Sequence, residues 1–191
     1  IYYNVDRIHT AIAENSIITF QYFQWNVDKS MELRHNGALY TVSPWALSWD
    51  DENYYLIVYD STKGIIKHFR VDKMLHITQT GRPREGRQVF KAFDTAIYAK
   101  KMFGMYGGEE ISVRIECDNS FAGVMIDRFG KDVSIIRIDD KRFAVNVEVA
   151  VSKQFLAWII GLGEGVKIVS PSSVVKMMND EIDRLIRQYK Q

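Results

Sequence analysis

The segment 64–74, GIIKHFRVDKM, brings together residue types that could hold an anion. If the segment is a strand, alternation places His68 and Arg70 on one face and Phe69 and Val71 on the other. The two apolar side chains suit a core, so His68 and Arg70 would point outward as a pair of donors. The planar guanidinium of an arginine matches the oxygens of a phosphate or a carboxylate. The spacing therefore predicts a ligand-binding face on which Arg70 is the main anchor.

Other side chains could complete this site. We expect Lys73 at its edge, Tyr55 as a stacking partner, and Lys67 nearby, although its strand parity is the opposite one. Basic and aromatic side chains together suit phosphate contacts combined with stacking on bases. A second interpretation stays open, in which Arg70 and Asp72 form a local salt bridge and the aromatic residues fill a core. The aromatic residues concerned are Tyr40, Trp45, Trp49, Tyr54, Tyr55 and Tyr59.

Charge is unevenly distributed along the chain. The whole sequence has a net charge of +1, which does not predict strong nucleic-acid binding by bulk charge. Residues 63–101, however, hold ten basic and three acidic residues, a local net charge of +7. Such a stripe could meet an anion, or it could be a solvated linker face that acids elsewhere in the fold balance.

The sequence offers little for catalysis or metal binding. The four histidines have no Cys or His partner at the spacing of a zinc site. Cys117 alternates with apolar neighbours, which is typical of a small core residue. Motifs of serine hydrolases, phosphate-binding loops and dinucleotide-binding folds are absent. We therefore predict no enzymatic activity, no catalytic residue, no metal and no cofactor.

Composition describes an ordinary globular protein. The chain has 191 residues, 47% of them hydrophobic and 26% charged, which excludes a disordered chain and allows one large domain or two small ones. No apolar run reaches the length of a membrane span. A single cysteine and no signal peptide predict a cytoplasmic location. Because the sequence does not begin with Met, we expect a fragment of a longer protein.

Short strands dominate residues 1–82. The periodicity predicts a helix over 5–15 and strands over 17–25, 54–60 and 65–74, with 75–80 ending the run. Asn36-Gly37 favours a hairpin between 31–33 and 39–42, because both residues tolerate a positive φ. Polar turns are expected at 50–53 and 61–64. Strands at this spacing indicate a small barrel or a sandwich.

Residues 83–108 read as a linker with one helix over 89–103, which Gly104, Gly107 and Gly108 would end. Residues 109–191 then follow the order βαββαβ, typical of a ferredoxin-like domain, with an extra helix at the end. Ser152 and Ser170 are the expected caps of the last two helices, with Pro171 in the first position of the final one. The predicted fold class is α+β.

The segments YTVSPWALSWDDENYYLIVYD and HFRVDKM resemble the WYL domain of bacterial transcriptional regulators. The triplet that names the family falls on Tyr54-Tyr55-Leu56. Residues 111–171 resemble the WCX-type extension that commonly follows a WYL domain, and FGMYGG at 103–108 resembles the usual junction. Several ordered motifs carry the likeness, which covers nearly the whole chain.

The resemblance implies an Sm-like five-stranded β-barrel that senses an effector, in some members single-stranded nucleic acid. The family's basic positions fall on Lys67, Arg70 and Lys73, whereas a further family arginine falls on Tyr40. It also implies a homodimer formed through the extension, for which Phe155, Trp158 and Met178 could supply apolar surface, although the same residues could be core. Promoter DNA would be bound by a winged helix-turn-helix, which these 191 residues do not contain.

The leading hypothesis is therefore the effector-sensing and dimerisation region of a bacterial regulator that binds an anionic ligand. A structural dimerisation module without a ligand is the alternative. An enzyme acting on an oligonucleotide is a third hypothesis, although the sequence has no acid–base or metal set to support it.

Overall fold

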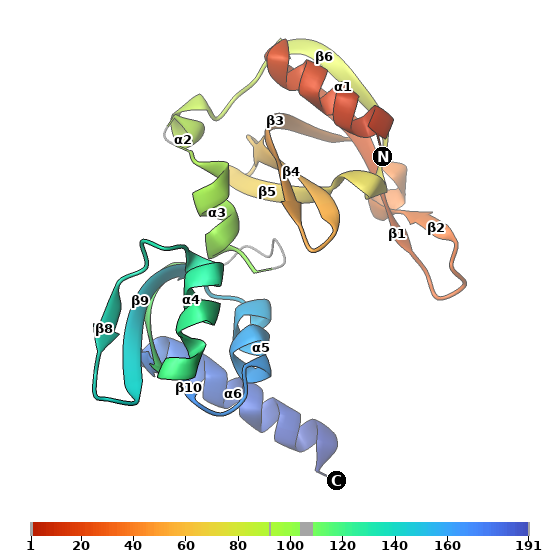
Figure 1. The fold of residues 1–191 in the computed structure, drawn as a ribbon. Helices are drawn as coiled ribbons and strands as arrows, with labels where there is room; N and C mark the ends of the chain where they lie inside the picture. Colours follow the sequence, from red (N-terminus) through yellow and green to blue (C-terminus); the bar gives the residue numbers. More distant parts are fainter. Residues whose placement is uncertain (1, 92, 104–108, 191) are drawn as a thin grey trace. The chain divides into compact units, whose positions relative to one another are not determined.

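The computed structural model describes residues 2–91, 93–103 and 109–190. The chain divides into two compact units, residues 1–99 and residues 100–191 (Figure 1). No helix in the described part of the chain is both long and apolar enough to cross a membrane.

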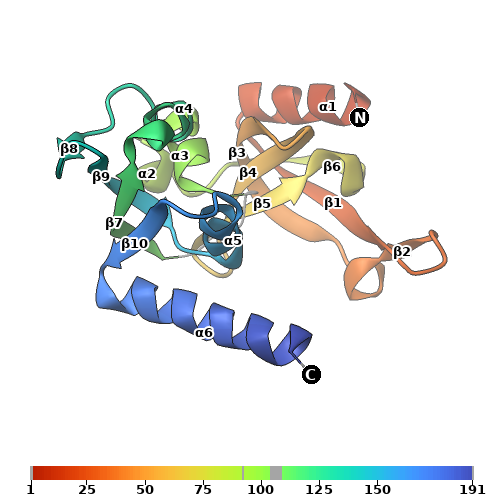
Figure 2. The ribbon, with the colours of Figure 1, turned by 60° about the horizontal axis from the view of Figure 1, so that its bottom comes forward.

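The first unit is a curled antiparallel sheet preceded by the helix α1 (Tyr2–Ala13). Five strands follow one another in space as β6-β1-β3-β4-β5, and short β2 pairs with the far end of β1. A single 3₁₀ turn, Val71–Lys73, joins β5 to β6. The expected five-stranded Sm-like architecture is confirmed as an open half-barrel, against which α1 packs (Figure 2). The strands are β1 (Ser16–Trp25), β2 (Met31–Leu33), β3 (Tyr40–Asp50), β4 (Asn53–Asp60), β5 (Ile65–Arg70) and β6 (Met74–Pro83).

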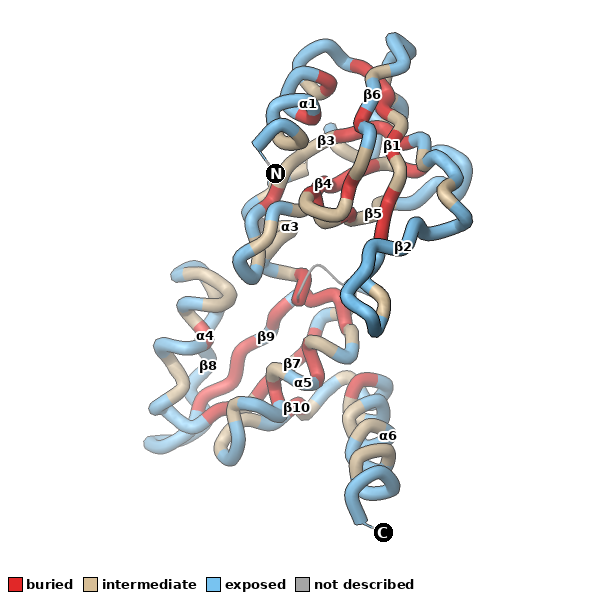
Figure 3. The backbone as a smooth tube through the Cα atoms, turned by 90° about the vertical axis from the view of Figure 1, so that its right-hand side faces the viewer, coloured by how far each residue is buried: buried red, intermediate tan, exposed pale blue. Residues whose placement is uncertain are grey.

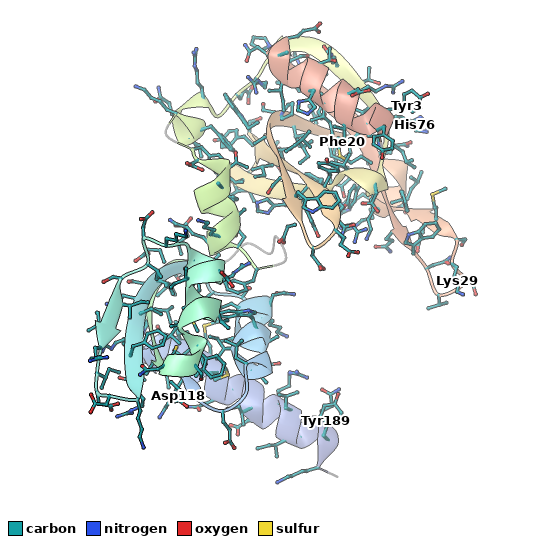
Figure 4. The ribbon with its side chains drawn as sticks, in the orientation of Figure 1. Tyr3, Phe20, Lys29, His76, Asp118 and Tyr189 are labelled. Carbon is teal, nitrogen blue, oxygen red and sulfur yellow. The ribbon has the colours of Figure 1, made fainter. Side chains whose placement is uncertain are left out.

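Strand alternation fills the concave side of this sheet. Leu56 and Phe69 face each other across β4 and β5, and both are buried around Phe20, which points into the half-barrel (Figure 4). Ile8 and Ala11 of α1 are fully buried in the same core. Burial follows the strands β1 and β4, whereas β2 is exposed along its length (Figure 3).

The hairpin predicted at Asn36-Gly37 is wrong. Both residues do have positive φ, 54° and 78°, as does His35 before them. The strand 31–33, however, turns back onto β1, with Phe23 opposite Leu33, and β1 rather than β2 pairs with β3. The left-handed residues therefore redirect the chain from β2 to β3 instead of closing a hairpin. The turn between β3 and β4 is confirmed.

The single helix predicted over 89–103 is also wrong. The chain forms two short helices, α2 (Arg87–Phe90) and α3 (Thr95–Lys101). The second helix begins directly after Asp94. The Asp94 side chain accepts a hydrogen bond from the Ala96 N–H at 2.8 Å, as a residue that caps a new helix does. Gly104, Gly107 and Gly108, expected to end the helix, lie outside the described residues. Residues 83–99 group with the first unit, and the boundaries expected at 82 and 108 stay predictions.

The second unit is ferredoxin-like, as expected. Its antiparallel sheet has the order β10-β7-β9-β8, and α6 is the extra C-terminal helix. The elements are β7 (Glu110–Asp118), α4 (Ala122–Phe129), β8 (Ile135–Arg137), β9 (Arg142–Ala150), α5 (Lys153–Gly161), β10 (Val166–Ser170) and α6 (Ser172–Tyr189).

One of the two predicted helix caps in this unit is correct. The Ser152 hydroxyl accepts a hydrogen bond from the Phe155 N–H at 3.2 Å, as a capping serine should. Ser170 instead ends β10, and Pro171 takes the capping position without a side-chain bond. Cys117 is buried in β7, where burial raises the pKa of its thiol to about 11, so it is a core residue, as expected.

Candidate functional site

Arg70 lies at the end of β5, and its guanidinium is held by Asp72 in the following 3₁₀ turn. Nε donates to Oδ1 at 3.0 Å and Nη2 donates to Oδ2 at 2.8 Å. The hydrogen bonds raise the pKa of Arg70 and lower that of Asp72. Both side chains stay about one-third exposed. The salt bridge between Arg70 and Asp72, which was the second interpretation of the sequence, is therefore present in the structure, and Arg70 stays at the surface.

Aromatic rings support this end of the sheet from the concave side. The Tyr22 hydroxyl accepts a hydrogen bond from the Arg70 backbone N–H at 3.1 Å. Burial raises the pKa of Tyr22, while the bond from Arg70 lowers it in part. The Tyr40 ring stacks on Phe20, with centroids 5.3 Å apart, and meets Phe69 edge-on. Tyr40, the position of a family arginine, is therefore a packing residue here.

Two further predicted residues lie close to Arg70. Tyr55 is directly opposite Arg70 in the pairing of β4 with β5. Lys73 ends the 3₁₀ turn, where its charge helps to lower the pKa of the Asp72 carboxyl. Arg70, Tyr55 and Lys73 are thus brought together as the sequence predicted.

Arg34 and His35 belong to the same neighbourhood and were not predicted. Arg34 lies close enough for its charge to lower the pKa of Tyr22, and the His35 ring is 5.6 Å from the Tyr40 ring. Both residues lie in the left-handed turn after β2, which a hydrogen bond from Gln21 Nε2 to the Gly37 carbonyl holds at 2.7 Å. The Asn36-Gly37 signal marked this turn, but nothing in the sequence placed it near Tyr22 and Tyr40.

His68 and Lys67 have other partners. His68 shares the strand face of Arg70, and its Nε2 lies 3.1 Å from the Tyr98 hydroxyl of α3. Lys67 points to the other face and pairs with the carboxylate of Asp60. These two predicted site residues are therefore held away from the cluster around Arg70.

We call Arg34, Arg70, Asp72, Lys73 and Tyr22 the Arg70 cluster. It holds three cationic side chains and one carboxylate, beside tyrosine rings. Such a set can bind a phosphate or carboxylate, provided that the anion shares Arg70 with Asp72. Among the described residues, no group of three or more His, Cys, Asp or Glu side chains is placed to hold a metal ion.

Several solved structures resemble this chain. It aligns over 98% of its length, at 14% identity and a TM-score of 0.54, with a CRISPR Cas-related protein, which supports the fold. It also aligns over its full length with the proteasome accessory factor PafBC of Arthrobacter aurescens, at 21% identity and a TM-score of 0.40. The chain spans 53% and 27% of those two chains. No curated protein matches.

Comparison with protein families accounts for both units. The WYL domain matches residues 3–79, which contain most of the half-barrel and the Arg70 cluster, and the WCX domain matches residues 109–186. The order and the positions agree with the two units of the fold. The chain therefore belongs to the WYL-domain family, with a WYL domain followed by a WCX domain.

Proposed function

We propose that this chain is the effector-sensing and dimerisation region of a bacterial, cytoplasmic transcriptional regulator. Its half-barrel binds an anionic ligand at the Arg70 cluster, and single-stranded nucleic acid is the first ligand to test. Promoter DNA is bound by a domain outside these residues. One observation carries the ligand proposal: Arg70 is fixed at the surface with Arg34 and Lys73 nearby and one carboxylate to balance the three charges.

Stacking supports a nucleic-acid ligand over a simple anion. Tyr55 lies across the strand pair from Arg70, so a base could stack on its ring while the adjoining phosphate reaches the guanidinium. The absence of a family arginine at position 40 removes one positive charge, so we expect moderate affinity.

The dimerisation proposal rests on α6. All three residues expected at the interface pack instead in or against the core of the second unit: Phe155, Trp158 and Met178. The exposed apolar residues lie farther along the helix: Ile182 is 42% exposed, Ile186 46% and Tyr189 75%. Tyr189 lies near the C-terminal end of the helix (Figure 4). A second copy of this chain is the partner we propose for this face.

A structural module without a ligand is the second candidate, because Asp72 already satisfies two donors of Arg70. Fluorescence anisotropy with a short labelled single-stranded oligonucleotide separates the two. We expect binding that weakens as salt rises, with a slope of about 0.7 in log K per log salt for each phosphate contacted. If neither oligonucleotides nor small phosphorylated anions bind at low salt, the structural module is correct.

A further inference from the structure

A second basic feature lies at the start of the segment that follows β6. Residues 82–91 hold four cationic side chains and one acidic one. The Arg84 N–H donates to the Asn15 carbonyl at 3.0 Å, and the Glu85 N–H donates to the Ser43 hydroxyl at 2.8 Å. The Trp45 indole N–H donates to the Glu85 carbonyl at 2.8 Å. These bonds fix the segment to Asn15, just before β1, and to β3, so its backbone has a defined position.

Gly86 fixes the path of the segment more closely still. Its φ is +83°, and a Cβ added there would lie 2.4 Å from the Tyr59 ring. Immediately beyond it, the Phe90 ring stacks on Trp45 with centroids 5.0 Å apart and ring planes 6° from parallel. The backbone between Arg84 and Phe90 is therefore packed tightly against the half-barrel.

The guanidinium of Arg84 is placed by neutral groups alone. It lies 4.2 Å from the centre of the Trp45 ring, Nε donates to the Asn15 side-chain oxygen at 3.1 Å, and Nη1 donates to the Pro44 carbonyl at 2.8 Å. Within the described ranges, no carboxylate lies within ion-pairing distance of Arg84 or of Arg87.

This environment contrasts with that of three other arginines whose pKa is shifted. Carboxylates raise the pKa of Arg70, Arg142 and Arg184. Burial and the positive charge of Arg87 instead lower the pKa of Arg84. Arg84 thus lies near a second positive charge and forms no ion pair in the described part of the chain, so an added anion would relieve the repulsion.

We infer that Arg84 and Arg87, on the rim formed by Trp45, bind a phosphate group. The free donors of a guanidinium match phosphate oxygens, and the fixed backbone lowers the entropic cost of binding. The Phe90 ring already stacks on the Trp45 ring, where a base would otherwise stack. The site therefore recognises the phosphate rather than a base. The phosphate could belong to a nucleic-acid backbone or to a small phosphorylated molecule. This site does not depend on the Arg70 cluster: α2 and β2, the latter just before Arg34, lie on opposite sides of the first unit (Figure 1).

The test is a nuclear magnetic resonance titration of the whole chain that follows the indole N–H signals of the four tryptophans. Inorganic pyrophosphate and a short single-stranded oligonucleotide are the two probes. We expect the Trp45 signal to shift with at least one probe while the Trp158 signal stays in place. A response to pyrophosphate alone supports the site and assigns a small phosphorylated ligand. A response to the oligonucleotide supports it and assigns a nucleic-acid backbone.

Arg87→Gln is the critical variant, because Arg87 is exposed and its loss should not disturb folding. We expect it to weaken the binding affinity, measured from the Trp45 shift as probe is added, by about threefold or more. Arg187→Gln, an exposed substitution of the same kind in α6, should leave it unchanged. No Trp45 shift with either probe, or a shift that Arg87→Gln does not weaken, overturns the inference. Arg70→Ala distinguishes this result from the proposed function: it should reduce oligonucleotide affinity, yet at saturation the Trp45 signal should still shift with whichever probe shifts it in the wild type.

Discussion

Asp72 holds Arg70 through two parallel hydrogen bonds, of 3.0 and 2.8 Å, at the surface of the half-barrel. A carboxylate in this position has two effects on an incoming anion. It orients the guanidinium, which lowers the entropic cost of binding, and it competes for the same donors. The balance of these effects determines how tightly the Arg70 cluster binds its ligand.

We predict that Asp72→Asn strengthens oligonucleotide binding by roughly fivefold to tenfold, about 1–1.4 kcal/mol. The substitution removes the negative charge nearest to the ligand and keeps a side chain of the same shape. The stability cost should stay below about 1 kcal/mol, because the ion pair is partly exposed. Anisotropy and thermal unfolding measure the two effects. Weaker binding by Asp72→Asn would show that orientation by Asp72 outweighs competition.

The Asp60 and Lys67 pair predicts a pH dependence of stability. Burial alone would raise the pKa of Asp60, but hydrogen bonds from Lys67 and Thr62 outweigh it and lower the pKa to about 2. The pKa of this carboxyl is lower in the folded protein than its ordinary value of 3.8, which applies in the unfolded chain. The ionised Asp60 therefore stabilises the fold at pH values above 3.8, and this stabilisation is lost as the pH falls toward 2.

Asp60→Asn should therefore lower the free energy of unfolding by about 2 kcal/mol at pH 7. The difference in free energy of unfolding between the variant and the wild type should decrease as the pH falls from 4 toward 2, which is about the range between the unfolded and folded pKa values of Asp60. Urea unfolding at pH 7 and at pH 3 measures this difference. A gap of equal size at both pH values would mean that Asp60 acts through its shape rather than its charge.

Gly86 and Gly81 form a matched pair for testing the packing of residues 84–90. Both have positive φ, +83° and +72°, but a Cβ at Gly81 meets nothing within 4 Å, whereas one at Gly86 overlaps Tyr59. Gly81→Ala should cost roughly 1 kcal/mol for the backbone alone. Gly86→Ala should cost about 1–3 kcal/mol more, because the ring must move. Thermal unfolding compares them; equal costs would mean that residues 84–90 shift freely.

The exposed face of α6 predicts the oligomeric state. Replacing both Ile182 and Ile186 by Glu places two charges on the proposed interface without entering the core. We expect light scattering to show a dimer for the wild type and a monomer for the double variant. Arg187→Gln is the control and should remain dimeric. A monomeric wild type at high micromolar concentration would refute the dimer.

Local patterns predicted most of the fold. Alternation around Phe69 placed His68 and Arg70 on the outer face, and the order of elements after residue 109 predicted the ferredoxin-like sheet. The errors arose where another strand partner or a side-chain hydrogen bond decided the structure, because a local sequence pattern does not show either. Asn36-Gly37 has the expected backbone angles, but β1 rather than β3 offered the better partner for strand 31–33. A single side-chain bond at Asp94 divided a segment that was helical by periodicity.

The candidate site was predictable only in part for the same reason. Arg70, Tyr55 and Lys73 are close in the sequence or across one strand pair, so spacing brought them together. Arg34 and Tyr22 reach the cluster through long-range pairing and were missed. The separation of Lys67 from Arg70 followed from strand parity, whereas the contact of His68 with Tyr98 depends on how α3 folds back onto the sheet.

The ratio of oligonucleotide affinities between the wild type and Arg70→Ala tests the central claim most directly. Anisotropy at low salt should show binding by the wild type and a loss of roughly tenfold or more in the variant, since a charge-assisted hydrogen-bond pair contributes about 1.5–3 kcal/mol. His68→Ala, whose partner is Tyr98, should bind within about twofold of the wild type if stability is unchanged. Wild-type binding that Arg70→Ala leaves intact would contradict the account.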